Sequence, residues 1–169
     1  MFALTENGYK KIIELSSLSY LDNNETNEPY LNFSELLKPS NGVSLFSGSF
    51  NGLFGQLFEK GKFKEIEKLY LELKSIYKDN FYIEIQRHGD VNENEFEKFN
   101  LSKSLTLEIP IIATNEVYYI DKTMHEAHDA LICIKDKTYI NEKNRLRLSD
   151  QHYLKNNSEM SELFADLPE

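Results

Sequence analysis

Strand-like and helix-like segments alternate along this chain at a spacing of roughly thirty residues, and this alternation constrains the fold more than any other feature. Three short apolar stretches predict strands: Val43–Gly48, Phe81–Gln86 and Ile109–Thr114. Each is followed by a segment with helical periodicity. Such an order is typical of βαβ units, in which parallel strands are joined by right-handed crossovers. The sequence therefore predicts an α/β fold.

The clearest helical pattern begins at Phe63 and continues to Tyr77. The first segment also predicts a helix, with an apolar face that includes Tyr9, Ile13 and Tyr20. A polar, turn-rich stretch, Asp22–Pro29, predicts a loop. Three further helices are expected in the first two thirds of the chain: a short one capped by Asn32 or Ser34 that ends before Pro39, one at Leu53–Lys60 closed by Gly61, and one at Glu93–Leu107. Two more are expected after them, one capped by Asp121 that carries Met124, Ala127, Leu131 and Ile134, and one that runs from a cap at Ser158 to Phe164. The segment Glu142–Tyr153 between them is expected to be irregular.

The composition narrows the class of protein. With 169 residues the chain is long enough for one domain with a core, and its net charge of -9 argues against a stand-alone nucleic-acid binder. The short basic group Lys143, Arg145 and Arg147 lies beside acidic residues and is typical of a solvated face. Cys133, the single cysteine, lies in an apolar run and predicts a buried thiol in a reducing cytoplasm. No run is long enough to span a membrane.

Polar side chains gather where the three predicted strands end. Because the carboxyl ends of parallel strands meet at one edge, we expect the segments 47–49, 86–89 and 115–118 to share a rim. His88 precedes a glycine and has two possible roles. It acts in a site, as a metal ligand or a general base, or it is an exposed histidine of a loop. Glu116 is either a ligand or base, or a surface charge. Spacing alone leaves both alternatives open.

The other histidines carry weaker signals. His125 and His128 are three residues apart, whereas the zinc motif HEXXH places its histidines four apart, so packing is the favoured interpretation. His152 lies in a polar loop and carries no signal. The glycine-rich segment 48–55 lacks the Lys-Ser/Thr of a phosphate-binding loop, and no pair of close aspartates suggests a two-metal polymerase centre.

At these same loops the sequence resembles the polymerase-and-histidinol-phosphatase (PHP) domain of bacterial DNA polymerase III alpha subunits. The similar stretches occur in the family's order and cover nearly the whole chain. They are Glu6–Ser17 (ENGYKKIIELSS), Val43–Gly52 (VSLFSGSFNG), Phe81–Gly89 (FYIEIQRHG), Pro110–Asp121 (PIIATNEVYYID), Ala127–Ile134 (AHDALICI) and Ser158–Glu169 (SEMSELFADLPE).

The resemblance implies an α/β fold that is a partial, distorted (βα) barrel of the PHP type with parallel strands. It implies that residues 1–169 form a single domain, the C-terminal part of a PHP domain truncated at both ends. The family's first ligands, in an HxH motif, a later Asp-His and a glutamate, lie upstream of the segment matching Glu6–Ser17. Family members also continue past the segment matching LFADLPE into polymerase domains. We therefore expect an internal fragment of a larger polypeptide.

The resemblance also assigns candidate ligand positions. His88 matches the histidine of the family's "IQ-x-HG" motif, and Glu116 stands at the aspartate of its "ATND-V-H-Y" motif. Tyr118 stands where that motif has a histidine, and Ser49 where many members have a cysteine after "LSG". A phenol and a hydroxyl are poor replacements for imidazole and thiolate on a transition metal. The expected metal site is therefore vestigial at His88 and Glu116 and degenerate at Ser49 and Tyr118, with no catalytic residue.

The function implied by the resemblance is that of a scaffold segment within a replicative DNA polymerase. The parent would use Mg²⁺ for nucleotidyl transfer, an intact PHP site would take Zn²⁺ or Mn²⁺, and this segment would need no cofactor. The implied partners are the remainder of the alpha chain, a proofreading exonuclease subunit, a sliding clamp and primer-template DNA bound by the parent. The alternative is a stand-alone PHP-type metal-dependent phosphoesterase or 3′–5′ exonuclease, for which the upstream ligands are absent from this chain.

Overall fold

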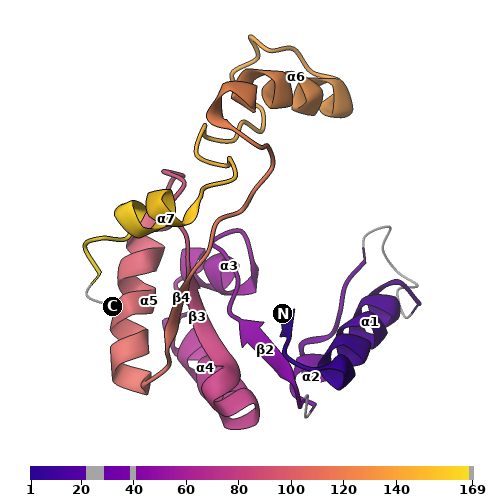
Figure 1. The fold of residues 1–169 in the computed structure, drawn as a ribbon, viewed down its shortest axis with the longest axis vertical. Coiled ribbons are helices and arrows are strands. Elements are labelled where there is room, and N and C mark those ends of the chain that lie inside the picture. Colours follow the sequence, from indigo (N-terminus) through magenta and orange to yellow (C-terminus); the bar gives the residue numbers. More distant parts are fainter. Residues whose placement is uncertain (22–28, 39–40, 168–169) are drawn as a thin grey trace. The chain divides into compact units, whose positions relative to one another are not determined.

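The computed structural model describes residues 1–21, 29–38 and 41–167, and the predicted loop Asp22–Pro29 lies almost wholly outside them. The described residues form two compact units. The first comprises Met1–Glu84 and Phe99–Ile112, and the second comprises Ile85–Lys98 and Ala113–Glu169. Each unit is described by itself below, with the elements labelled as in Figure 1.

A four-stranded, mostly parallel open sheet organises the first unit. Its order is β1 (Phe2–Ala3), β2 (Val43–Phe46), β3 (Phe81–Ile85), β4 (Ile111–Ala113). β2 and β3 pair in parallel with Leu45 opposite Phe81, whereas β1, which the sequence pattern does not predict, pairs antiparallel with β2. The three predicted strands are therefore confirmed, and the open sheet agrees with part of a PHP-type barrel.

Helices α3 (Leu53–Glu59) and α4 (Phe63–Tyr77) supply much of the first unit's core. The predicted stripe of α4 is confirmed, since four of its members are buried: Ile66, Tyr70, Leu73 and Tyr77. Tyr70 donates a hydrogen bond of 3.0 Å to the side-chain oxygen of fully buried Asn100 on α5 (Glu93–Leu107). Burial raises the pKa of Tyr70, so this phenol stays protonated and keeps the donor that Asn100 requires.

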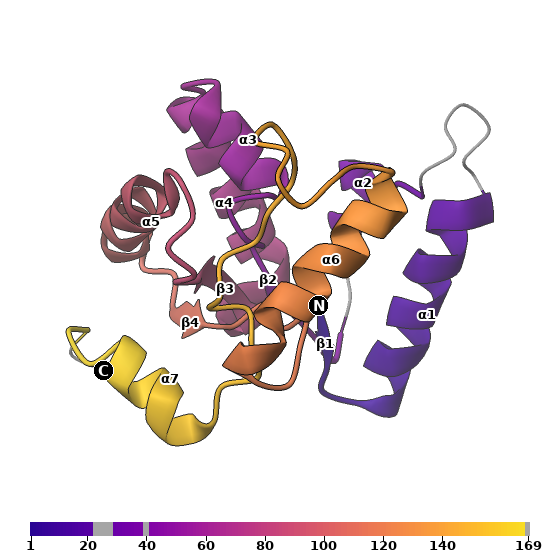
Figure 2. The same cartoon turned by 90° about the horizontal axis from the view of Figure 1, so that it is seen from above.

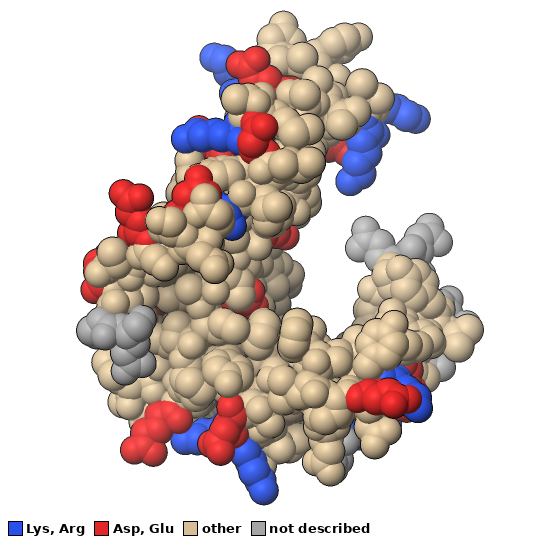
Figure 3. Space-filling model, viewed as in Figure 1, with Lys and Arg blue, Asp and Glu red and all other residues tan. Residues whose placement is uncertain are grey.

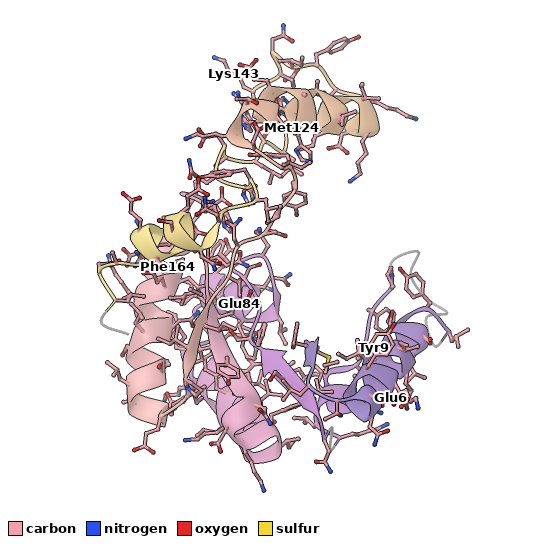
Figure 4. The ribbon with its side chains drawn as sticks, viewed as in Figure 1. Glu6, Tyr9, Glu84, Met124, Lys143 and Phe164 are labelled. Carbon is pink, nitrogen blue, oxygen red and sulfur yellow. The ribbon has the colours of Figure 1, made fainter. Side chains whose placement is uncertain are left out.

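Helix α1 (Glu6–Leu21) forms as predicted, but its contact face differs from the expected one. Figures 1 and 2 both place it beside β1 and β2. The buried residues are Gly8 and Leu15, whereas Tyr9 and Tyr20 are 59 % and 69 % exposed, and Figure 4 labels Tyr9. A Cβ on Gly8 would lie 1.9 Å from the carbonyl oxygen of Gly42, so the helix approaches the backbone through its glycine. Short helix α2 (Phe33–Leu36) follows Asn32, one of the two predicted cap positions.

The second unit contains α6 (His125–Asp136), α7 (Asn157–Leu163) and long irregular segments, as predicted for 142–153. Asp121 caps the turn before α6, its side chain accepting the Thr123 N–H. The predicted packing face of α6 is corrected, because Leu131 and Ile134 are 62 % and 74 % exposed while Asp129 and Cys133 are buried. Asp129 faces inward because it forms two short hydrogen bonds, of 2.6 and 2.7 Å, with the guanidinium of Arg145.

The cap of α7 also differs from the prediction. Asn156, not Ser158, is the N-cap, and its side chain accepts the Glu159 backbone N–H while the Glu159 carboxylate accepts the Asn156 N–H. An amide oxygen one residue before the helix can reach this N–H, whereas a serine already inside the first turn cannot. The helix itself is confirmed.

The surface of the described residues carries mixed charges. Figure 3 shows blue and red side chains interspersed on the face drawn, without a broad blue area. Within the described ranges, no helix is both long enough and apolar enough to cross a membrane.

Candidate functional site

The loop that follows β3 places His88 in the second unit. Gly89 adopts a left-handed φ of 78°, which turns the chain immediately after the histidine. Glu93, the first residue of α5, accepts the backbone N–H groups of His88 (2.6 Å) and Gly89 (2.8 Å), and its second oxygen lies 3.1 Å from His88 Nδ1. Burial alone would raise the pKa of Glu93, but these bonds with His88 and Gly89 outweigh it and lower that pKa. An ionised Glu93 therefore fixes the loop and holds a proton on His88 Nδ1.

The second ring nitrogen of His88 is engaged by the segment that follows β4. The Glu116 backbone N–H donates to His88 Nε2 at 3.2 Å, and the Asn115 side-chain oxygen lies 3.1 Å from the same nitrogen. Asn115 is itself fixed, since its amide donates to the carbonyl of Tyr153 and its oxygen accepts from Lys155. His88, which is 2 % exposed, thus contacts a protein group at each nitrogen.

Glu116 and Tyr118 lie on the same segment and bond to each other. The Tyr118 hydroxyl donates to a Glu116 carboxylate oxygen at 2.8 Å, and Tyr118 is about half exposed. Burial, and then the Glu116 carboxylate, raises the pKa of Tyr118, so the phenol remains a donor rather than becoming an anionic ligand. Ser49, the remaining candidate position, lies in the first unit.

His152 is a residue of this site that the sequence did not indicate. It is 1 % exposed, and its ring stacks on that of His88 with 4.0 Å between centroids and 4° between planes. Nδ1 lies 3.1 Å from the Glu116 carbonyl oxygen, to which it donates, and Nε2 lies 3.6 Å from Asp90 Oδ2. Burial, then the adjacent His88, lowers the pKa of His152 and favours its neutral form. No local sequence signal could have identified it, because the stack joins segments far apart in the chain.

Arg87, next to His88, has a structural part in the same region. Its guanidinium bonds to Glu97 on α5 and to Asp166 beyond α7, and lies 4.7 Å from the ring centroid of Phe164, labelled in Figure 4. These carboxylates raise the pKa of Arg87. The side chain therefore ties the first turns of α5 to the C-terminal segment.

The two histidines of α6 lie in packing environments, as the sequence favours. His125 Nε2 is 2.9 Å from the Leu148 carbonyl oxygen, and the ring of His128 packs against those of Tyr118 and Tyr119. The structure describes no third metal-ligating side chain grouped with this pair among the residues it covers.

The geometry can be compared with the metal cluster that a PHP fold implies. His88 contacts the Glu93 carboxylate through Nδ1 and accepts the Glu116 backbone N–H at Nε2. One carboxylate oxygen of Glu116 accepts a hydrogen bond from the hydroxyl of Tyr118, which stands where the family has a histidine. Because the Tyr118 phenol occupies a Glu116 carboxylate oxygen and is itself a poor ligand, these positions do not supply the set of ligand atoms that a multinuclear metal centre needs. A different group of potential ligands lies next to them: His88, Asp90 and His152 have ligand atoms within 4.8 Å of one another.

Comparison with known families defines the class of protein. The PHP domain model matches residues 1–88, which is just over half of the chain. The chain belongs to the PHP domain family.

Relatives with a more specific name match the entire chain. A DNA polymerase III subunit alpha from Caulobacter vibrioides is 37 % identical over 169 residues, which cover 100 % of this chain and 15 % of the relative. The proteins of the same name from Rickettsia prowazekii and Borreliella burgdorferi are 34 % and 31 % identical and cover 99 % and 100 % of the chain. The chain thus spans about 15 % of the length of these relatives.

Proposed function

We propose that this chain is the PHP segment of a replicative DNA polymerase III alpha subunit and acts there as a scaffold. The observation that carries the proposal is the similarity to several such subunits along the whole chain, which occupies only a small part of each relative. Nucleotidyl transfer, with Mg²⁺, would belong to the remainder of the polypeptide. The two compact units are then parts of one PHP domain.

The scaffold role within this proposal is supported by the site. His88 is the family's ligand histidine by resemblance, yet it is fixed between Glu93 and the Glu116 backbone like a residue that organises two loops. Glu116 and Tyr118 satisfy each other. We propose that the metal positions His88 and Glu116 are vestigial and that Ser49 and Tyr118 mark the loss of hydrolytic chemistry.

The proposed partners follow from the same assignment. The remainder of the alpha chain would cover the exposed apolar side chains of this segment, which include Leu131 and Ile134. A proofreading exonuclease subunit, a sliding clamp and primer-template DNA would be partners of the intact polymerase in the cytoplasm.

The decisive assay for the scaffold role is hydrolysis by the purified chain. We expect no release of phosphate from a generic phosphoester, and no shortening of a 3′-labelled primer, in Mn²⁺ or Zn²⁺. His88→Ala should leave this background unchanged. Hydrolysis that EDTA abolishes and that His88→Ala removes would instead support the stand-alone phosphoesterase or 3′–5′ exonuclease.

A further inference from the structure

Two hydrogen-bond acceptors face each other beside His88. Because His152 Nδ1 donates to the Glu116 carbonyl, Nε2 carries the ring's lone pair. This nitrogen has no hydrogen-bond partner in the described part of the chain and points at the Asp90 carboxylate, 3.6 Å away. That distance is too long for a hydrogen bond. A buried ring nitrogen without a hydrogen-bond partner that faces a carboxylate is an arrangement that a cation between the two groups would stabilise.

The separation suits a metal ion. Two ligands of a tetrahedral Zn²⁺ with bonds of about 2.0–2.1 Å lie about 3.4 Å apart. His152 Nε2 and Asp90 Oδ2, at 3.6 Å, are close to that spacing without movement. The nearby ring of His88 contributes a further ligand atom within 4.8 Å of both.

Because the two rings are stacked, His88 must move before both imidazoles can bind the same ion. Their planes are parallel to within 4°, so a single ion cannot lie in both planes at once. The ring of His88 must tilt out of the stack and exchange the Glu116 N–H for the ion. Its Nδ1 stays on Glu93, which leaves Nε2 for the metal.

We propose that His152, Asp90 and His88 bind one divalent transition-metal cation of the Zn²⁺ type, with water completing its coordination. Two imidazoles and a carboxylate are a donor set that such ions accept. Both histidines already hold the outer contacts typical of metal-bound imidazoles, one Nδ1 on a carbonyl and the other on a carboxylate.

This site is not the one that the family resemblance implies. It shares His88 with that set, but it uses Asp90 and His152 and leaves out Glu116, Tyr118 and Ser49. A single ion here joins the loop after β3 to the segment before α7 and stabilises the second unit. This ion would have a stabilising role beyond the proposed scaffold function and would not supply hydrolytic chemistry.

The test is titration of the EDTA-treated, purified chain with ZnCl₂ in a calorimeter, and with CoCl₂ followed by visible absorption. We expect one ion per chain and tetrahedral Co²⁺ bands. Asp90→Asn should lower the affinity for Zn²⁺ at least tenfold, and His152→Ala should do the same and abolish the Co²⁺ bands. Asp90 is partly exposed, so its isosteric variant should keep the far-UV circular dichroism of the parent even where His152→Ala does not fold.

Two control variants separate this site from others. His125→Ala removes an imidazole of the same unit outside the cluster, and Glu116→Gln removes the family-implied carboxylate; both should bind Zn²⁺ as the parent does. Absence of stoichiometric binding, or binding unchanged in folded Asp90→Asn, would overturn the proposal. Loss confined to Glu116→Gln would overturn it and place the ion at the family's positions. The hydrolysis assay tests the scaffold function independently of these outcomes.

Discussion

At the level of single residues, Glu93 holds the loop that carries His88. Its carboxylate accepts two backbone N–H groups and contacts the imidazole, and the side chain is largely buried. Hydrogen bonds to charged groups contribute more to stability than neutral ones. The loop geometry therefore depends on the ionised form of one side chain.

Glu93→Gln tests this dependence. The neutral amide keeps the shape but weakens the charge-assisted bonds, so we expect the free energy of unfolding to fall by about 1–2 kcal/mol. Urea denaturation followed by circular dichroism measures it. Glu95→Gln is the matched control, because Glu95 lies on the same turn, is exposed and forms an ion pair with Lys98. Equal effects of the two substitutions would contradict the role given to Glu93.

The ion pair of Asp129 and Arg145 predicts a pH dependence of stability. Hydrogen bonds from Arg145 lower the pKa of Asp129 in the folded chain. A carboxyl with a lowered folded pKa contributes stability above its unfolded pKa of about 3.9, and loses it as the pH falls through the lower folded value. The unfolding free energy of the parent should therefore exceed that of Asp129→Asn at pH 7, and the difference should shrink below about pH 4.

Denaturant unfolding from pH 7 to pH 2 measures this difference. Asp136→Asn, at an exposed position of the same helix, should change the unfolding free energy little. A difference between the parent and Asp129→Asn that is constant over the whole range would contradict the assignment.

The candidate site could be predicted only in part at this scale. His88 and Glu116 are found from their places at strand ends and from the family motifs. His152 could not be found, because its importance arises from a stack with a ring 4.0 Å away that belongs to a distant segment. Likewise Glu93 reads as an ordinary first-turn acidic residue, and only the conformation of Gly89 turns the neighbouring N–H groups toward it.

At the level of elements, the cap of α7 offers a direct comparison of prediction and structure. The reciprocal bonds of Asn156 and Glu159 satisfy N–H groups that the helix leaves free. Asn156→Ala should lower stability by about 1 kcal/mol. Ser158→Ala, at the position that the sequence pattern favours, should have little effect. Thermal unfolding of the two variants measures the contrast, and a larger loss in Ser158→Ala would restore the original assignment.

The periodicity of the sequence predicted which segments form strands and helices, but it did not predict which face of each helix packs against the rest of the protein. The strands after residues 42, 80 and 110 and the α4 stripe were predictable because their patterns are strong. The buried faces of α1 and α6 were not predictable from these patterns. The close approach of Gly8 to the Gly42 backbone determines the buried face of α1, and the ion pair between Asp129 and Arg145 determines that of α6. Apolar content alone would bury Tyr9 and Ile134, which are exposed.

At the level of the whole molecule, several large apolar side chains are exposed to solvent. Leu131, Ile134, Tyr139 and Ile140 are each more than 60 % exposed on and after α6. Large exposed apolar groups indicate interaction surfaces or aggregation. This is the behaviour expected of a segment that is covered by the rest of a longer polypeptide.

The isolated chain should accordingly be marginally stable and should self-associate. Light scattering after size-exclusion chromatography should show aggregates at concentrations where Ile134→Lys remains largely monomeric, because a charge interrupts the apolar surface. Lys135→Ala, an adjacent exposed substitution on the same helix, should not improve solubility. A monomer with a sharp, reversible unfolding transition would argue against an incomplete domain.

The proposed membership of this sequence in a replicative DNA polymerase is tested most directly by immunoprecipitation from the cells that encode it. An antibody raised against the 19.8 kDa chain should recognise a band several times larger. The precipitate should extend a primer on a template with deoxynucleotides and Mg²⁺. A reactive band at 19.8 kDa alone, from a precipitate without primer extension, would contradict this assignment.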